Sequence, residues 1–314
     1  MDFEISEQMT TILDMVRDFM DREVVPLEGE MLHGDPASLD EQVRAAQDKV
    51  RQMGVWAPNH PVEFGGLGLS MVDHGLLSEA LGRSPLGHVV FGTQAPDAPP
   101  YSRTSMILVP TETPGFNLVR NVSVMGHTGS GHASHGEVMY QGCRVPTTNL
   151  LGPRGGGFTI AQERLGPGRI HHCMRWLGIA SRSFDLMCAR ANQRMIDPNG
   201  DTLADRQVIQ HWAAELDAEI RGARLQTLHA AWMIDQQGAK AARDEIAAIK
   251  FSVANTMLKA VDTAIQVHGA LGVTDDTVLA YWYRHERAAR IYDGADEVHK
   301  TSLGRRILRR YASS

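Results

Sequence analysis

Residues 266–299, QVHGALGVTDDTVLAYWYRHERAARIYDGADEVH, carry the clearest indication of how this chain folds. They begin in an amphipathic helical pattern that breaks at two glycines, and a second helical pattern follows over residues 277–290. The second pattern ends at a lone acid beside a glycine, Asp293-Gly294. An acid placed there can lie where the backbone approaches a ligand closely. Taken alone, an Asp-Gly pair is more often a solvated turn.

The composition excludes several classes of protein. The 314 residues are enough for a large core and for two or three domains. Hydrophobic residues make up 43% of the chain and the net charge is −6, so we expect a globular protein that does not bind nucleic acid. No apolar run is long enough to span a membrane, and the acidic N-terminal residues resemble neither a signal peptide nor a transit peptide. The three cysteines form no CxxC pair, which favours reduced thiols in a cytoplasmic protein.

The spacing of apolar residues changes twice along the chain. Apolar residues at helical spacing over 6–31, 39–53 and 71–81 predict an N-terminal helical domain of residues 1–98. Strand-like patterns then predict a truncated β domain of residues 99–152. We place its strands at residues 105–110, 116–125, 136–140 and 143–145.

Helical spacing returns after the β segment. We place helices at residues 169–187, 203–235, 239–268 and 277–290. Long helices with short connections pack as an antiparallel bundle, so we expect a C-terminal four-helix bundle in residues 153–314. The predicted fold class is therefore mainly α with a small β insert.

Four stretches together resemble the acyl-CoA dehydrogenase family. They are MGVWAPNHPVEFGGLGLSMVDHGLLSEALGR (53–83), MGHTGSGHASHGEVMYQGCRVPTTNLLGPRGGGF (125–158), RLGPGRIHHCMRWLGIA (164–180) and residues 266–299. The last is similar to the family's Gln-x-x-Gly-Gly-x-Gly turn followed by a helix that ends in an acid-Gly pair. The stretches occur in the family's order, and the resemblance covers nearly the whole chain. It points to the branch whose base is Asp and not Glu, related to the eukaryotic members 10 and 11.

The resemblance implies an FAD-dependent acyl-CoA dehydrogenase of fatty acid metabolism, with Asp293 as the general base. The family removes a proton from the α carbon of an acyl-CoA thioester and transfers a hydride from the β carbon to the flavin. Aspartate is one methylene shorter than glutamate, so the backbone must approach the substrate more closely, as Gly294 permits. Arg169 matches a residue that contacts the CoA end of the substrate. Gly168 occupies the position where other members place the base, and it cannot serve as one.

The resemblance also implies residues that bind FAD, whose pyrophosphate needs cations and backbone donors. Arg194 matches an arginine that reaches the FAD of a neighbouring subunit, and Gln207 is a second contact on the next helix. Gln266 and Gly269 match the Gln-x-x-Gly turn, and Glu297 lies where the segment after the catalytic acid meets FAD. A site shared between subunits implies a homodimer or homotetramer. The family usually passes its electrons to an electron-transferring flavoprotein.

The chain departs from the family between the counterparts of Ala98 and Pro99. There the family has a helix and the first β strands, whose Thr-Glu-Pro-type and Trp-Phe-Thr-type turns touch the flavin ring. This chain joins the two sides directly and contains neither motif. A second hypothesis therefore stays open, in which the protein is a non-catalytic relative that serves as an oligomeric scaffold or partner subunit.

Other polar clusters have simpler interpretations. His127, His132 and His135 lie in a Gly/Ser-rich segment without further ligands at regular spacing, so no metal site is predicted. The adjacent pair His171-His172 points in two directions from one helix and is not a ligand pair. We interpret the arginines of residues 305–310 as a solvated helix end.

Overall fold

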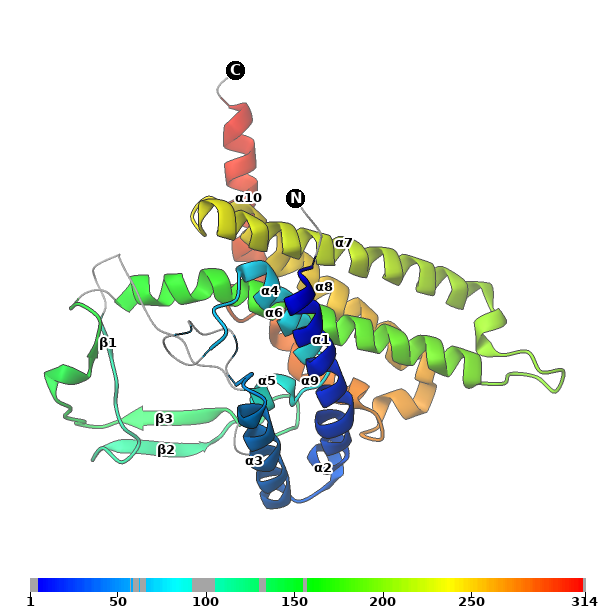
Figure 1. Ribbon diagram of the computed structural model, residues 1–314, viewed down its shortest axis with the longest axis horizontal. Helices are drawn as coiled ribbons and strands as arrows, with labels where there is room; N and C mark the ends of the chain where they lie inside the picture. The colour runs from blue at the N-terminus through cyan, green and yellow to red at the C-terminus, as the bar shows by residue number, and fades with distance from the viewer. Residues whose placement is uncertain are drawn as a thin grey trace. The chain divides into compact units, whose positions relative to one another are not determined.

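The computed structural model describes residues 5–56, 58, 62, 66–91, 105–129, 134–154 and 157–312. The chain divides into two compact units, one of residues 1–93 with 168–314 and one of residues 94–167 (Figure 1). Helices make up the first unit, and the strands all lie in the second. The mainly α fold with a small β insert is thus confirmed. The junction at Ala98–Pro99 and His132 lie outside the described residues.

Side-chain caps and one proline determine where the N-terminal helices begin and break. The elements are α1 (Glu7–Phe19), the π-helix η1 (Met20–Val24), the 3-10 helix η2 (Val25–Leu27), α2 (Glu28–His33), α3 (Pro36–Gln52), α4 (Met71–Leu81) and α5 (Gly87–Phe91). Ser6, Asp35 and Ser70 each accept a first-turn backbone N–H at 3.1 Å, which begins α1, α3 and α4. Pro26 has no N–H to donate, and the regular α-helix gives way to π and 3-10 turns around it.

Five α-helices form the C-terminal part, and the first is longer than the sequence predicts. They are α6 (Gly157–Gln193), α7 (Gln207–Gln237), α8 (Arg243–His268), α9 (Val278–Glu286) and α10 (Asp296–Tyr311), with the 3-10 helices η6 (Leu203–Asp205), η7 (Gly269–Val273) and η8 (Arg287–Arg290). The predicted start of α6 at residue 169 was wrong, because the helix continues through Pro167. Within the described residues, no helix combines the length and hydropathy needed to cross a membrane.

One hydrophobic cluster joins the N-terminal helices to the bundle within the first unit. Asp235 of α7 accepts the N–H groups of Met71 and Val72 at 2.9 and 3.3 Å, and so holds the N-terminus of α4. The backbones of α4 and α6 pack so closely that a Cβ on Gly178 would lie 2.2 Å from the Glu79 carbonyl oxygen. This packing fixes α4 and α6, which carry several residues of the candidate site.

The second unit contains two short antiparallel ladders. Strand β1 (Met106–Ile107) pairs with β4 (Leu150–Leu151), and β2 (Phe116–Asn121) pairs with β3 (Gly136–Tyr140). The predicted strand at residues 143–145 was wrong, because the chain leaves β3 through a turn at Gly142 (φ 63°) and meets β1 only at β4. Leu118 and Tyr140 remain 60% and 59% exposed. The ladders therefore bury little apolar surface of their own.

Candidate functional site

Asp293 lies in the tight loop between η8 and α10, and its backbone is left-handed. Its φ is 54°, and φ of the following Gly294 is 104°. A non-glycine residue in this conformation costs about 1 kcal/mol or more, so surrounding contacts must hold it. Gly294 has a second constraint, because a Cβ there would lie 2.7 Å from His299 Nε2. The acid-Gly pair is therefore a constrained turn rather than a solvated one.

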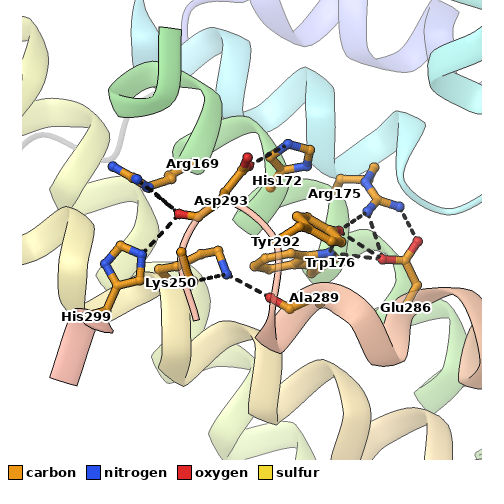
Figure 2. A network of polar contacts seen from close by, with 11 residues as sticks. Arg169, His172, Arg175, Trp176, Lys250, Glu286, Ala289, Tyr292, Asp293 and His299 are labelled. Carbon is orange, nitrogen blue, oxygen red and sulfur yellow. Dashed lines mark hydrogen bonds and ion pairs between the residues drawn. The ribbon is translucent and has the colours of Figure 1, made fainter. Parts of the chain in front are cut away.

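Two side chains from different helices, α6 and α10, hold the Asp293 carbonyl (Figure 2). Arg169 of α6 donates from Nε and Nη2 at 3.1 and 3.0 Å. His299 of α10 lies with Nε2 3.2 Å from the same oxygen, and because a carbonyl only accepts, Nε2 carries the proton. Burial lowers the pKa of Arg169 and also that of His299. The two donors supply the contacts that a left-handed aspartate requires.

Lys250 of α8 holds the backbone on both sides of Asp293. Its side chain is fully buried, and Nζ donates to the Ala289 carbonyl at 2.7 Å and to the Gly294 carbonyl at 3.3 Å. The ammonium also lies 5.1 Å from the ring centroid of Trp176. Burial lowers the pKa of Lys250, but the carbonyls and the aromatic face solvate its charge. A cation at the end of η8 also complements the dipole of that helix.

The Asp293 carboxylate is largely shielded from water and contacts a histidine. The side chain is 15% exposed, and Oδ2 lies 3.0 Å from Nε2 of His172 on α6 (Figure 2). The other ring nitrogen of His172, Nδ1, is buried and has no hydrogen-bond partner among the described residues. Partial desolvation of a carboxylate is what makes it a stronger base.

A buried ion pair supports the residue before Asp293. Arg175 contacts both carboxylate oxygens of Glu286, at 2.5 and 2.8 Å. Trp176 donates from Nε1 to Glu286 at 3.1 Å, and the Tyr292 hydroxyl lies 3.0 Å from Arg175 Nη2. Burial would raise the pKa of Glu286, but the charge and hydrogen bonds of Arg175 lower it below its usual range. The network fixes Tyr292, and with it the direction in which the loop enters Asp293.

Further histidines pack behind His172 without forming a metal site. The ring of His171 lies 4.4 Å from that of His88, centroid to centroid, and its Nδ1 lies 2.9 Å from the Ser78 hydroxyl and 3.3 Å from His74 Nε2. Burial lowers the pKa of His74 to about 4 and keeps His88 and His171 well below their ordinary value. No group of three metal-ligating side chains occurs in the described part of the chain.

Four of the five expected FAD-binding residues lie at the end of the bundle where α6 stops, and the fifth, Glu297, lies on α10. Arg194 follows α6 directly, and a Cβ on Gly269 (φ 66°), at the end of α8, would lie 3.4 Å from Arg194 Nη1. Gln207 is the first residue of α7, which the Leu203 N–H to Arg194 carbonyl bond (2.9 Å) brings back to this end. Gln266 is exposed in the last turn of α8. A cation, a bare backbone and two exposed amides thus meet here.

This group is separate from the Asp293 loop within one chain. Gln266 and Lys250 lie on the same helix, sixteen residues and so about 24 Å apart.

Glu297, in the first turn of α10, is exposed and lines a groove of about 720 Å³ together with Arg243 and Arg305. The arginines of residues 305–310 are mostly exposed, as expected for a solvated helix end, although Arg306 and Arg310 both pair with Asp244 of α8.

Arg169 was expected in the site, but His172, Lys250 and His299, which also contact Asp293 or its loop, were not. His172 was set aside because it does not share a direction with His171, which is the geometry that lets it reach Asp293. Lys250 gave a usable signal, since it falls in phase with the apolar residues Ile246, Ile249 and Val253 of α8. A lysine inside an apolar stripe predicts a buried charge that binds a specific partner.

Two family models match most of the chain. Residues 6–96 match the model "Acyl-CoA dehydrogenase, N-terminal domain", and residues 155–308 match "Acyl-CoA dehydrogenase, C-terminal domain". Neither match covers residues 97–154, which include all the described strands.

The chain is also similar in sequence to named proteins. The chain is 48% identical over 226 residues to "Probable acyl-CoA dehydrogenase FadE2" of Mycobacterium tuberculosis, covering 72% of this chain and 54% of that protein. It is 46% identical over 221 residues to "Acyl-CoA dehydrogenase family member 11" of Rattus norvegicus, covering 70% of this chain and 28% of that protein. The chain thus spans about half of the first relative and about a quarter of the second.

Two solved structures with a similar fold illustrate how almost all of this chain aligns with known structures. A structure assigned as an acyl-CoA dehydrogenase from Mycobacterium abscessus aligns with a TM-score of 0.91 and 27% identity, covering 99% of this chain and 100% of that one. An acyl-CoA dehydrogenase complexed with FAD from Bacillus anthracis aligns with a TM-score of 0.79 and 18% identity, covering 98% and 68%, and shows the shared fold alone.

Proposed function

The chain belongs to the acyl-CoA dehydrogenase family, and on this basis we propose that it is an FAD-dependent enzyme that forms an α,β double bond in an acyl-CoA thioester. Asp293 is the proposed general base. The observation that carries this proposal is a carboxylate only 15% exposed on a left-handed loop held by Arg169, Lys250 and His299. A solvated turn acid needs no such support.

The proposed chemistry at Asp293 is removal of the proton from the α carbon of the substrate. A carbon acid is weak, and shielding from water is the general means by which a carboxylate gains proton affinity towards it. The loop contacts keep the carboxylate in one direction, which reduces the cost of reaching the reactive geometry. Arg169 would contact the substrate through Nη1 while Nε and Nη2 hold the Asp293 carbonyl. Gly294 would let the thioester approach the backbone.

The residues at the other end of the bundle fit the phosphates of FAD. Arg194 supplies a cation beside Gly269, where the missing side chain leaves the backbone open to a ligand. Gln207 and Gln266 add exposed amide donors, and Glu297 is proposed to meet FAD from the first turn of α10. When bound, FAD accepts the hydride from the β carbon. A site shared between subunits would make the enzyme a homodimer or homotetramer that reduces an electron-transferring flavoprotein.

A non-catalytic role remains the second candidate. The chain contains neither of the two turns that touch the flavin ring in the family, and the two matching family models leave residues 97–154 uncovered. In that case the helical unit would serve as an oligomeric scaffold or partner subunit. Binding of FAD separates the two candidates, since a scaffold has no need of it.

Visible absorbance and bleaching by substrate test the proposal. Protein incubated with FAD and freed of excess should keep the flavin bands, and an acyl-CoA added without oxygen should bleach them. Asp293→Asn should keep the bands and lose the bleaching. The control Asp276→Asn removes an exposed turn carboxylate and should bleach like the wild type. A chain that stays colourless supports the scaffold, and bleaching of Asp293→Asn at the wild-type rate excludes this base.

A further inference from the structure

We propose that His172 is a positioning residue, a neutral imidazole that donates from Nε2 to the Asp293 carboxylate and fixes its direction. This inference rests on the proposed function, in which Asp293 is the base. It assigns a role to a half-buried ring that the chemistry itself does not use. The backbone of Asp293 already has donors, and His172 contacts its side chain at 3.0 Å.

The hydrogen-bonding pattern determines the tautomer of His172. An ionised carboxylate only accepts, so Nε2, 3.0 Å from Asp293 Oδ2, must carry a hydrogen. Nδ1 is buried without a partner in the described part of the chain. A proton on Nδ1 would therefore be an unsatisfied buried donor, whereas a bare lone pair there costs less. The contact is thus a hydrogen bond from a neutral ring.

Aromatic packing prevents the ring from turning away. His172 stacks on Trp176, with centroids 5.9 Å apart and planes at 26°, and meets Tyr292 edge-on at 5.4 Å. Both partners are tied to Glu286 through their polar atoms, at 3.1 Å from Trp176 and 3.5 Å from Tyr292 (Figure 2). Through Trp176 and Tyr292, the Glu286 ion pair therefore also helps to fix the direction of the Asp293 carboxylate.

The donor also affects the proton affinity of Asp293. The titratable and charged groups that interact with Asp293 or its carbonyl include Arg169, His172 and Cys173 of α6, Lys250 of α8, and His299 of α10. The His172 bond stabilises the ionised carboxylate and opposes the effect of burial. Without it we expect the base to titrate about one pH unit higher, and at a pH below that midpoint the smaller ionised fraction should slow bleaching about tenfold.

The test compares His172→Leu and His172→Gln by the pH profile of anaerobic flavin bleaching with an acyl-CoA. Leucine removes the donor, so the midpoint of the acid limb should rise by about one pH unit. Glutamine keeps an amide N–H near the position of Nε2 and should restore the wild-type midpoint. The control His171→Gln changes the neighbouring ring, which faces Ser78 and His74, and should leave the midpoint unchanged. A leucine variant with the wild-type profile overturns the proposal.

A second measurement needs neither activity nor a stable leucine variant. In protein labelled with ¹⁵N-histidine, the His172 signals, assigned by their loss in His172→Gln, should report a neutral ring protonated on Nε2 at pH 7. A cationic ring or the Nδ1–H tautomer overturns the proposal. If the wild type binds no FAD or is not bleached, the proposed function fails. If it is bleached but the tautomer or profile is wrong, only the role of His172 fails.

Discussion

Replacing Glu286 by glutamine tests the ion pair that supports the loop before Asp293. The substitution keeps the shape of the side chain and removes its charge. Arg175, whose side chain is 19% exposed, then loses the carboxylate whose oxygens lie 2.5 and 2.8 Å from its nitrogens. Trp176, which donates to Glu286 at 3.1 Å, keeps an acceptor in the amide oxygen. The main change is therefore a buried guanidinium left without a counter-charge.

The expected cost follows from the burial of the pair. Removing one partner of a buried ion pair costs about 3–5 kcal/mol, and the retained amide oxygen places Glu286→Gln near the lower end, about 3 kcal/mol. Glu219 and Lys259 form a pair of the same length, 2.5 Å, but their side chains are 41% and 43% exposed. Exposed pairs contribute about 0.5 kcal/mol, which makes Glu219→Gln the matched control.

Urea unfolding followed by tryptophan fluorescence measures both variants, because Trp176 and Trp282 are fully buried. The free energy of unfolding should fall much further in Glu286→Gln than in Glu219→Gln. Adding Arg175→Met to Glu286→Gln should recover part of the loss, since the unpaired charge is removed. Equal losses in the two single variants would contradict the burial and the role assigned to the Arg175–Glu286 pair.

Two further predictions concern the packing behind the site. His74 and His171 are buried with lowered pKa values, so below pH 6.5 the unfolded chain binds more protons than the folded one, and stability should fall as the pH drops from 6.5 towards 4. For His74, whose pKa is about 4, the loss of unfolding free energy between pH 7.5 and pH 5 is about 2 kcal/mol. The urea midpoint at the two pH values measures this loss, and an unchanged midpoint would refute the prediction. Gly178→Ala should cost about 2 kcal/mol, because its Cβ would lie 2.2 Å from the Glu79 carbonyl. The control is Gly222→Ala at an exposed position of α7, where an added Cβ would have no atom within 4 Å, so this alanine should stabilise the protein by about 0.5 kcal/mol. Similar effects of the two alanines on the melting temperature would count against the close α4–α6 packing.

Burial of apolar stripes made most helices predictable. The α7 and α8 boundaries lie within a few residues of the predicted ones, since their buried residues recur at helical spacing. The early start of α6 was not predictable from spacing, because Pro167 reads as a break. Strand β4 is two residues long and is defined by its pairing with β1, a contact that local sequence does not specify.

The candidate site was predictable only in part, for a similar reason. Asp293-Gly294 stands out locally as an acid beside a glycine after a helix. Its supporting contacts are distant in the sequence, since Arg169 is separated from Asp293 by 124 positions and Lys250 from Ala289 by 39. Such pairs become visible only when α6 and α8 pack beside the loop. A charge inside an apolar stripe, as at Lys250, was the local signal that could have been used.

Exchange of the α-hydrogens of an acyl-CoA in D2O tests the role of Asp293 most directly, because it reports proton removal without requiring the hydride step. NMR of the recovered thioester gives the exchange rate for the wild type and for Asp293→Asn. We expect the wild type to accelerate exchange and the asparagine variant to lose about 10²–10⁴-fold of that rate. Equal exchange by the two proteins would contradict the assignment of Asp293 as the base.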